Sequence, residues 1–224
     1  MFKKRKFRKN TYSQCGEDII IDFALSQMNI NNPYYIDIGA HHPYYLSNTA
    51  YFYEKGCTGI CIEPDPSLFE EIKKYRKKDI CLNIGVGINN MTESDFYIIN
   101  PSTLNTFSKE EAIKYDKSKN HSIEKVIKMP LMKINEIINK YAKLKPNLMS
   151  IDIEGLDLQV LKTIDFNTFM PEVICVETLT YTEDTSERKI IEIIDFMRSK
   201  NYFVYADTYI NTIFIEKNSW NNRK

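Results

Sequence analysis

The sequence lacks several features that would assign it to large protein classes at once. No apolar run approaches the length of a transmembrane helix, and no internal repeat or low-complexity linker is present. Lys and Arg total 30 and Asp and Glu total 30, so the formal net charge is zero. A neutral chain has no global attraction to nucleic acid. We therefore expect no membrane span and no nucleic-acid partner.

Cysteine is sparse and odd in number, with five residues in the chain. Cys61, Cys81 and Cys175 lie in apolar, strand-like runs, where reduced cysteine behaves as a small hydrophobic residue. A zinc site needs paired Cys or His ligands, and Cys57 with Cys61 has no second pair. The pattern predicts free structural thiols in a cytoplasmic protein.

The first ten residues, MFKKRKFRKN, are strongly basic but lack the apolar core of a secretory leader. We expect residues 1–11 to form a disordered basic arm, either simply solvated or in weak contact with an anionic surface or substrate. The remaining length suits a single domain over residues 12–217, followed by a polar tail at 218–224. The sequence does not reveal the oligomeric state.

Apolar strands alternate with amphipathic helices along most of the chain. Asp65 before Pro66 is a strong helix start, because the carboxylate can cap and proline fits the first helical position. This alternation predicts an α/β fold with a mostly parallel sheet and helices on both faces. The expected helices are 16–28, 46–55, 66–77, 134–141, one from about 156, and 190–197, and the expected parallel strands are 34–38, 58–62, 80–84, 147–153 and 172–177.

Two further regions have different patterns. Residues 94–99 predict a strand, residues 100–107 a polar loop, and Ser108 with Glu111 the capped start of a short helix. Residues 202–206 and 212–216 are β-rich runs with no helix between them. They predict a C-terminal antiparallel hairpin at one edge of the sheet.

Acidic side chains stand at four of the five predicted parallel strand ends. In an open α/β sheet the ligand binds outside the carboxyl ends of the strands, at the switch in strand order. A core has no use for carboxylates there, because burying an unpaired charge is costly. We therefore expect a binding site at this edge. The acidic positions are Asp37, Glu63, Asp152 with Glu154, and Glu177, while Asn83 ends the remaining strand.

The turn after the first strand favours a cofactor without phosphates. Dinucleotide sites use several glycines around a pyrophosphate, whereas this turn has Gly39 alone and acids surround it. S-adenosylmethionine carries a cationic ammonium and sulfonium, and its ribose hydroxyls can donate to a carboxylate. Glu63, 26 residues after Asp37, is placed for that ribose contact.

Five motifs, in order, resemble those of the FkbM-type S-adenosylmethionine-dependent methyltransferases. They are YSQCGED, YIDIGAHHP, GICIEPDP, LNTFS and SIDIEGLDLQVLK, and the resemblance spans roughly residues 12–215. It implies a Rossmann-like methyltransferase fold and O-methylation of a small molecule, often a sugar or a polyketide. The chain departs from the broader methyltransferase pattern at His42-Pro43, where that pattern has a further glycine.

The resemblance also implies which residues hold the cofactor. Asp37, Gly39, Ala40 and His41 would shape the methionine end of the pocket. Glu63 would hold the ribose, Pro64 and Asn83 would surround the adenine, and Gln14 would close over the cofactor. Of the adjacent histidines His41 and His42, we expect at most one to face the ligand.

Methyl transfer to a hydroxyl needs the acceptor oxygen, the methyl and the sulfur in line, and the hydroxyl must lose a proton. His42 is the candidate general base. Alternatively Asp152, Glu154 and Glu177 hold Mg or Mn, which lowers the pKa of the hydroxyl, with Asp152 required for catalysis. These carboxylates could instead bond backbone donors of the following segment or only line the pocket.

In the polar loop, Asn105 and Thr106, with Ser108, could hold acceptor hydroxyls. The loop could equally be a solvent-exposed connection with no part in binding. We expect an O-methyltransferase acting on a sugar or nucleotide-sugar of surface polysaccharide biosynthesis. The alternative is a catalytically silent module that binds a nucleotide-sugar or a partner protein. A nucleic-acid methyltransferase is disfavoured because NPYY precedes the first strand, and a hydrolase because no G-x-S-x-G turn is present.

Overall fold

The computed structural model describes residues 9–118, 120–182 and 186–223. Residues 1–8, most of the expected basic arm, lie outside these ranges. The described end of that arm contacts the first helix: Lys9 pairs with Asp22 at 3.2 Å, and the Thr11 hydroxyl donates to Asp18 at 2.7 Å.

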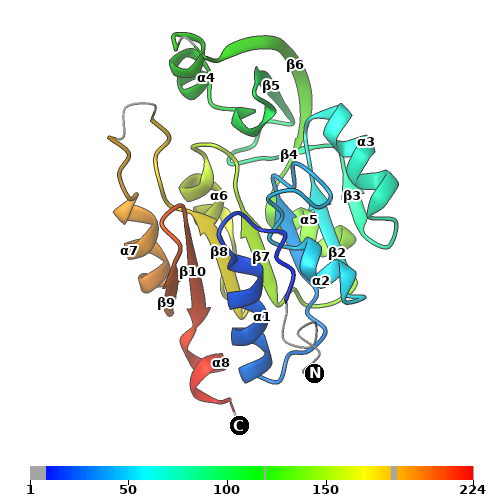
Figure 1. Cartoon of the computed structure of the whole chain (residues 1–224), viewed down its shortest axis with the longest axis vertical. Coiled ribbons are helices and arrows are strands. Elements are labelled where there is room, and N and C mark those ends of the chain that lie inside the picture. The colour runs from blue at the N-terminus through cyan, green and yellow to red at the C-terminus, as the bar shows by residue number, and fades with distance from the viewer. Residues whose placement is uncertain (1–8, 119, 183–185, 224) are drawn as a thin grey trace, which may run out of the picture.

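A seven-stranded sheet forms the centre of the protein, in the order β3-β2-β1-β7-β8-β10-β9 (Figure 1). Neighbours from β3 to β8 pair in parallel, and β10 is antiparallel to both β8 and β9. The predicted mostly parallel sheet with a C-terminal hairpin is confirmed. The strands are β1 Tyr35–Ile38, β2 Gly59–Ile62, β3 Ile80–Leu82, β7 Leu148–Ile151, β8 Val173–Glu177, β9 Tyr202–Asp207 and β10 Asn211–Glu216.

Helices cover both faces of this sheet, because strand side chains alternate between two cores. On β1, Tyr35 belongs to the core under α1 (Glu17–Gln27), α2 (Ala50–Glu54) and α3 (Pro66–Tyr75). Ile36 and Ile38 belong to the core under α5 (Ile134–Tyr141), α6 (Asp157–Thr163) and α7 (Ile191–Ser199). The carboxylate of Asp65 caps α3 by accepting from the N–H groups of Ser67 and Leu68, as predicted.

Helix α2 is shorter than the predicted 46–55. It begins at Ala50, because the preceding residues form a hydrogen-bonded loop instead. The Ser47 hydroxyl accepts from the N–H of Ala50 at 3.1 Å, and Leu46 has a positive φ of 55°. This loop carries Asn48 and Thr49 toward the sheet, where Thr49 contacts Asp37.

A second, three-stranded sheet, β4-β6-β5, lies between β3 and α5 in the chain. Its strands are β4 Gly85–Val86, β5 Glu93–Asn100 and β6 Ser122–Met132, and α4 Lys109–Asp116 follows a short 3-10 helix, Ser102–Leu104. We call residues 93–132 the cap; its strands β5 and β6 and its helix α4 lie at the top of Figure 1. The sequence predicts β5 and the start of α4 but not β6.

Strand β6 was missed because it buries little. Most of its side chains are exposed and only Met129 is buried; the apolar alternation is limited to Ile123, Ile127, Met129 and Leu131 and is interrupted by Lys125. Pro130 also argues against a strand, although at the start of the pairing it faces Glu93. Backbone pairing with β5 over eight positions holds β6 in place.

The chain ends in helix α8, Lys217–Asn221, within the stretch expected as a polar tail from residue 218. The Glu216 carboxylate caps it, and Trp220 packs on Tyr205 with ring centroids 5.2 Å apart. In the parts of the chain that the structure describes, no helix combines the length and the apolar character needed to cross a membrane.

The strand order reverses at β1, which lies between β2 and β7. Here the turns that follow β1 and β7 touch. Gly39 has a φ of 77°, and a Cβ built on it would lie 1.9 Å from the carbonyl oxygen of Asp152. Only glycine satisfies both the left-handed backbone and this close approach.

We expect Gly39→Ala to lower the free energy of unfolding by about 2–5 kcal/mol, since left-handed strain adds to overpacking. Gly56 is the matched control: its φ is 93°, but a Cβ there meets nothing within 4 Å. Gly56→Ala should therefore cost only the strain, about 1–2 kcal/mol. Urea unfolding of both variants measures the difference, and equal losses would contradict the close approach.

Candidate active site

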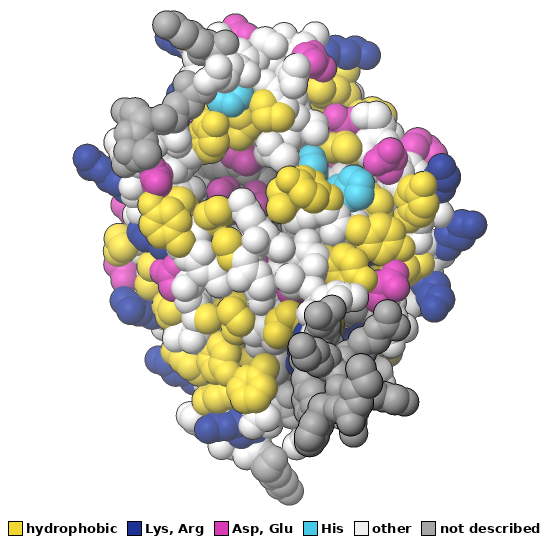
Figure 2. Space-filling model, in the orientation of Figure 1, with side chains coloured by type: hydrophobic (Ala, Val, Ile, Leu, Met, Phe, Trp, Pro, Cys, Tyr) yellow, Lys and Arg dark blue, Asp and Glu magenta, His cyan; other side chains and the backbone are white. Residues whose placement is uncertain are grey.

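A cavity of about 530 Å³ opens at the carboxyl ends of β1, β2, β7 and β8, below the cap. Figure 2 shows it as a hollow in the upper half of the molecule, with acidic side chains at its bottom and hydrophobic side chains around it. The site lies at the switch in strand order, where an open α/β sheet binds its ligand. The cavity is lined by the turns after β1, β2, β7 and β8 and by the cap.

The turn after β1 is fixed by bonds to β2. The N–H groups of Gly39 and Ala40 both donate to the carbonyl of Ile62, at 3.0 and 3.1 Å. His41 follows with a φ of 51° and donates its backbone N–H to Oε2 of Glu63 at 2.8 Å. The predicted residues Gly39, Ala40 and His41 therefore lie together on the cavity wall.

Glu63 is almost fully buried at the end of β2 and reaches the cavity wall. Its second oxygen accepts from the backbone N–H of Asp65 at 2.8 Å, so each carboxylate oxygen already has one donor. Burial raises the pKa of Glu63 to about 8, with smaller contributions from Asp65 and Asp37. Each oxygen retains a second lone pair, which is compatible with the expected contact to ribose hydroxyls.

Asp37 lies at the end of β1 on the cavity wall and is 4 % exposed. Its Oδ2 accepts a short hydrogen bond of 2.5 Å from the hydroxyl of Thr49. Burial raises the pKa of Asp37, and the bond from Thr49 and the charge of Arg76 oppose this shift.

The two histidines point in different directions. His41 lines the cavity, and its Nε2 lies 3.2 Å from the hydroxyl of Ser102 in the cap; burial lowers its pKa. The Nδ1 of His42 accepts from the backbone N–H groups of Tyr44 and Tyr45, and its Nε2 faces Glu71. His42 is not among the lining residues, so the geometry gives no support to it as the general base.

The side of the cavity next to β2 and β4 is apolar. Pro64 lies there as expected, together with Leu68 and Ile84, which the sequence reasoning missed. Asn83 does not line the cavity: its amide donates to the carbonyls of Glu63 and Pro64, both at 2.9 Å. Asn83 therefore ties the end of β3 to the end of β2 behind the wall.

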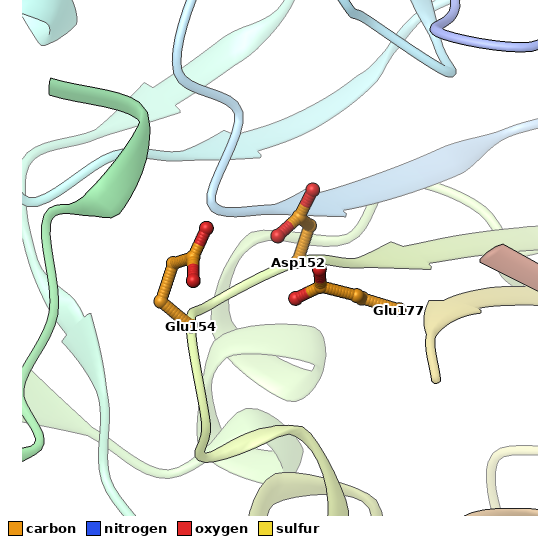
Figure 3. Close-up of side chains that lie close together, drawn as sticks. All are labelled: Asp152, Glu154 and Glu177. Carbon is orange, nitrogen blue, oxygen red and sulfur yellow. The ribbon is translucent and has the colours of Figure 1, made fainter. Parts of the chain in front are cut away.

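Asp152, Glu154 and Glu177 converge at the bottom of the cavity (Figure 3). One oxygen from each lies within 4.8 Å of the others. The carboxylates of Asp152 and Glu177 accept no hydrogen bond from any described residue. The carboxylate of Glu154 accepts one, from the hydroxyl of Tyr115 at 3.0 Å. We call these three residues the acid triad.

Crowding and burial oppose negative charge in the acid triad. Burial and the nearby Asp157 raise the pKa of Asp152 to about 7. Burial and the charge of Asp152 raise the pKa values of Glu154 and Glu177 well above their usual range. A cation bound among the three would relieve this repulsion, and oxygen donors of this kind suit Mg or Mn.

The alternative role for these acids, bonding the backbone of the following segment, is not seen for the carboxylates of Asp152 or Glu154 among the described residues; Asp157 instead bonds the loop that precedes it. Its two oxygens accept from the N–H groups of Ile153 and Gly155 at 3.2 and 3.3 Å. Asp157 is buried at the start of α6, and the sequence reasoning passed over it. Its position four residues after Ile153, in the first turn of a helix, was the available signal.

The cap contributes Asn105 and Thr106 to the wall, but their side chains are engaged in holding it. The amide of Asn105 donates to Asp65 at 3.0 Å and accepts from the backbone of Ile99. The hydroxyl of Thr106 donates to the carbonyl of Glu154 at 2.9 Å. Their part in holding acceptor hydroxyls stays a prediction.

Gln14 and three tyrosines form the rim of the cavity. Gln14 is exposed in the bend before α1 and lines the opening; its part in closing over the cofactor stays a prediction. Tyr45, Tyr181 and Tyr209 also line it and are 60 %, 36 % and 59 % exposed. The sequence reasoning missed these tyrosines, because they lie in loops without a periodic pattern.

The chain matches a known protein-family model over most of its length. The model of the family described as "Methyltransferase FkbM domain" matches residues 37–204. A search of curated proteins found no match.

Solved structures match this chain at low identity and with TM-scores below 0.5. Precorrin-6y C5,15-methyltransferase from Geobacter metallireducens is 11 % identical, with 95 % of this chain and 94 % of that chain covered and a TM-score of 0.45. The Burkholderia thailandensis 1,6-didemethyltoxoflavin-N1-methyltransferase, solved with its substrate and S-adenosylhomocysteine, is 7 % identical, with 89 % and 75 % covered and a TM-score of 0.45.

The raised pKa of Glu63 predicts that the ligand-free protein loses stability as the pH rises. In the unfolded chain this carboxyl titrates near 4.5, so between there and about pH 8 the folded form keeps a proton that the unfolded form has lost. The free energy of unfolding therefore falls as pH rises, by at most about 1.4 kcal/mol per pH unit for one group. Glu63→Gln should remove this contribution to the slope.

Urea unfolding at several values between pH 5 and 8 tests this. The amide that replaces the carboxylate can accept from only one of the two backbone N–H groups, so the variant should be less stable than wild type at pH 5. The diagnostic quantity is therefore the slope of the free energy of unfolding against pH. Glu70→Gln, at an exposed position in the nearby helix α3, is the control and should keep the wild-type slope. A Glu63→Gln slope equal to wild type would contradict the assignment.

Proposed function

Because this chain belongs to the FkbM methyltransferase family, we propose that it transfers the methyl group of S-adenosylmethionine to a hydroxyl of a small molecule, with a sugar as the acceptor class. The carbon–sulfur bond of the sulfonium breaks as the carbon–oxygen bond forms, and the acceptor hydroxyl loses its proton. The products are S-adenosylhomocysteine and a methyl ether. The reaction requires a cofactor site, an acceptor site and a route for the proton.

The cofactor site of this proposal is the turn after β1 and the wall of β2. The positive ammonium and sulfonium of the cofactor would lie against the acidic side of the cavity, near Asp37 and the acid triad. Its ribose would bond Glu63, and its adenine would lie between Pro64, Leu68 and Ile84. The apolar wall and the acidic wall match the two ends of this nucleoside.

The acid triad is the single observation that carries the acceptor chemistry. Three carboxylates converge beside the cofactor turn, and two of them have no donor within the described part of the chain. We infer that Asp152, Glu154 and Glu177 hold a divalent cation, Mg or Mn. Such an ion, when bound, would lower the pKa of a coordinated hydroxyl. The triad would then hold the acceptor oxygen in position through the ion, and the carboxylate of Asp152 would take up the proton of the hydroxyl.

The composition of the wall supports an uncharged acceptor. None of the described residues that line the cavity is Lys or Arg. A nucleotide-sugar would bring a diphosphate for which the lining side chains offer no cationic partner and which only the inferred ion could pair, so a free sugar or glycoside fits better than an activated one. Tyr45 and Tyr209, exposed at the rim, offer flat apolar faces against which a sugar ring can pack.

The test is a screen of sugars and nucleotide-sugars for S-adenosylhomocysteine formation, with Mg, with Mn and with excess chelator. Asp152→Asn and Glu177→Gln should each lower turnover about 100-fold or more, because each removes a cation ligand. S-adenosylhomocysteine binding, measured by calorimetry, should change little. Glu192→Gln, an exposed change on α7, is the control and should keep full activity.

Full activity in excess chelator would remove the cation from the proposal. Turnover of nucleotide-sugars alone would overturn the uncharged acceptor. Cofactor binding without turnover of any hydroxyl compound would favour the catalytically silent binding module.

A further inference from the structure

A buried guanidinium stands behind the cofactor turn. Arg76, directly after α3, is 1 % exposed and forms an ion pair with Asp79 at 2.7 Å. Its remaining donors reach the hydroxyl of Tyr35 at 2.9 Å, the carbonyl of Pro43 at 3.3 Å and the hydroxyl of Thr49 at 3.1 Å. One side chain thus connects β1 with the middle and the end of the loop between β1 and α2.

The contact with Thr49 fixes the direction of a hydrogen-bond chain. Arginine has no acceptor, so Arg76 must donate to the Thr49 oxygen. The single hydroxyl hydrogen of Thr49 is then available to Asp37, whose Oδ2 lies 2.5 Å away. Asp37 must accept this bond. Donation from Arg76 also polarises the hydroxyl and strengthens its bond to the carboxylate.

The hydrogen bonds from Arg76 to Thr49 and from Thr49 to Asp37 offset part of the free-energy cost of burying a charged Asp37. Thr49 is fully buried and Asp37 is nearly so, which favours a neutral acid. The bond from Thr49 and the charge of Arg76 both favour the carboxylate. The side chain of Asp37 is therefore held in one orientation at the cavity wall, next to the turn at Gly39.

We propose that Thr49 and Arg76 are positioning residues of the cofactor site, which hold Asp37 as an oriented carboxylate for the α-ammonium of the cofactor. This inference rests on the proposed function, since it assumes that an S-adenosyl nucleoside occupies the cavity. Neither Thr49 nor Arg76 lines the cavity, so both act through Asp37.

The experiment compares Thr49→Val, which keeps the shape and loses the hydroxyl, with Thr49→Ser, which keeps the hydroxyl. Two probes are titrated by calorimetry: S-adenosylhomocysteine, and 5′-methylthioadenosine, which lacks the amino-acid part. Thr49→Val should weaken S-adenosylhomocysteine binding by about ten- to hundredfold, the effect of one hydrogen bond to a charged group. The affinity of Thr49→Val for 5′-methylthioadenosine should stay at the wild-type value. Thr49→Ser should bind S-adenosylhomocysteine with the wild-type affinity.

A double-mutant cycle with Asp37→Asn separates positioning from general damage. In the Asp37→Asn background, Thr49→Val should have little further effect on S-adenosylhomocysteine affinity. If Thr49→Val does not fold, Thr49→Ala replaces it in the same comparison. Additive losses, or equal weakening of both probes, would show a merely structural role and overturn the inference.

The outcomes also separate this inference from the function it rests on. Wild-type protein that binds neither nucleoside would overturn the proposed function and the inference with it. Wild-type and Thr49→Val proteins that bind S-adenosylhomocysteine equally would overturn the inference alone.

Discussion

Negative charge gathered at one edge of the sheet is the constraint on which the rest of the structure depends. The ends of β1, β2, β7 and β8 place several carboxylates around one cavity, and burial raises the pKa of each of them. Such a set is unfavourable in an empty protein and favourable around a cation. The crowded carboxylates therefore lower the stability of the unliganded protein, and a positively charged ligand would relieve this by binding among them.

The structure treats these carboxylates in two ways. Asp37 and Glu63 receive donors from the protein itself, a hydroxyl for the first and two backbone N–H groups for the second. Asp152 and Glu177 receive none from the described residues. The first pair is thus prepared before any ligand arrives, whereas the second pair is completed only by what binds. Under the proposed function, this division would separate the cofactor side of the cavity from the acceptor side.

The sequence was most informative where burial or a local rule determines the structure. The parallel strands are short apolar runs, Asp65 with Pro66 starts a helix, and acids at strand ends mark the cavity. Strand β6 escaped prediction because backbone pairing rather than burial holds it. The orientation of His42 also could not be read from its position, since backbone N–H groups two and three residues further along the chain turn its ring to the outside. Contacts of this kind depend on loop geometry.

The position of β1 between β2 and β7 has a consequence for how the protein is made. Gly39 touches the backbone of Asp152, so the cofactor turn is bounded on one side by residues from the first third of the chain and on the other by residues from the second half. Until β7 leaves the ribosome, β1 is an unpaired sheet edge and the pocket has one wall. Ligand capture must then follow synthesis of most of the polypeptide, so the cofactor cannot assist the earliest stages of folding.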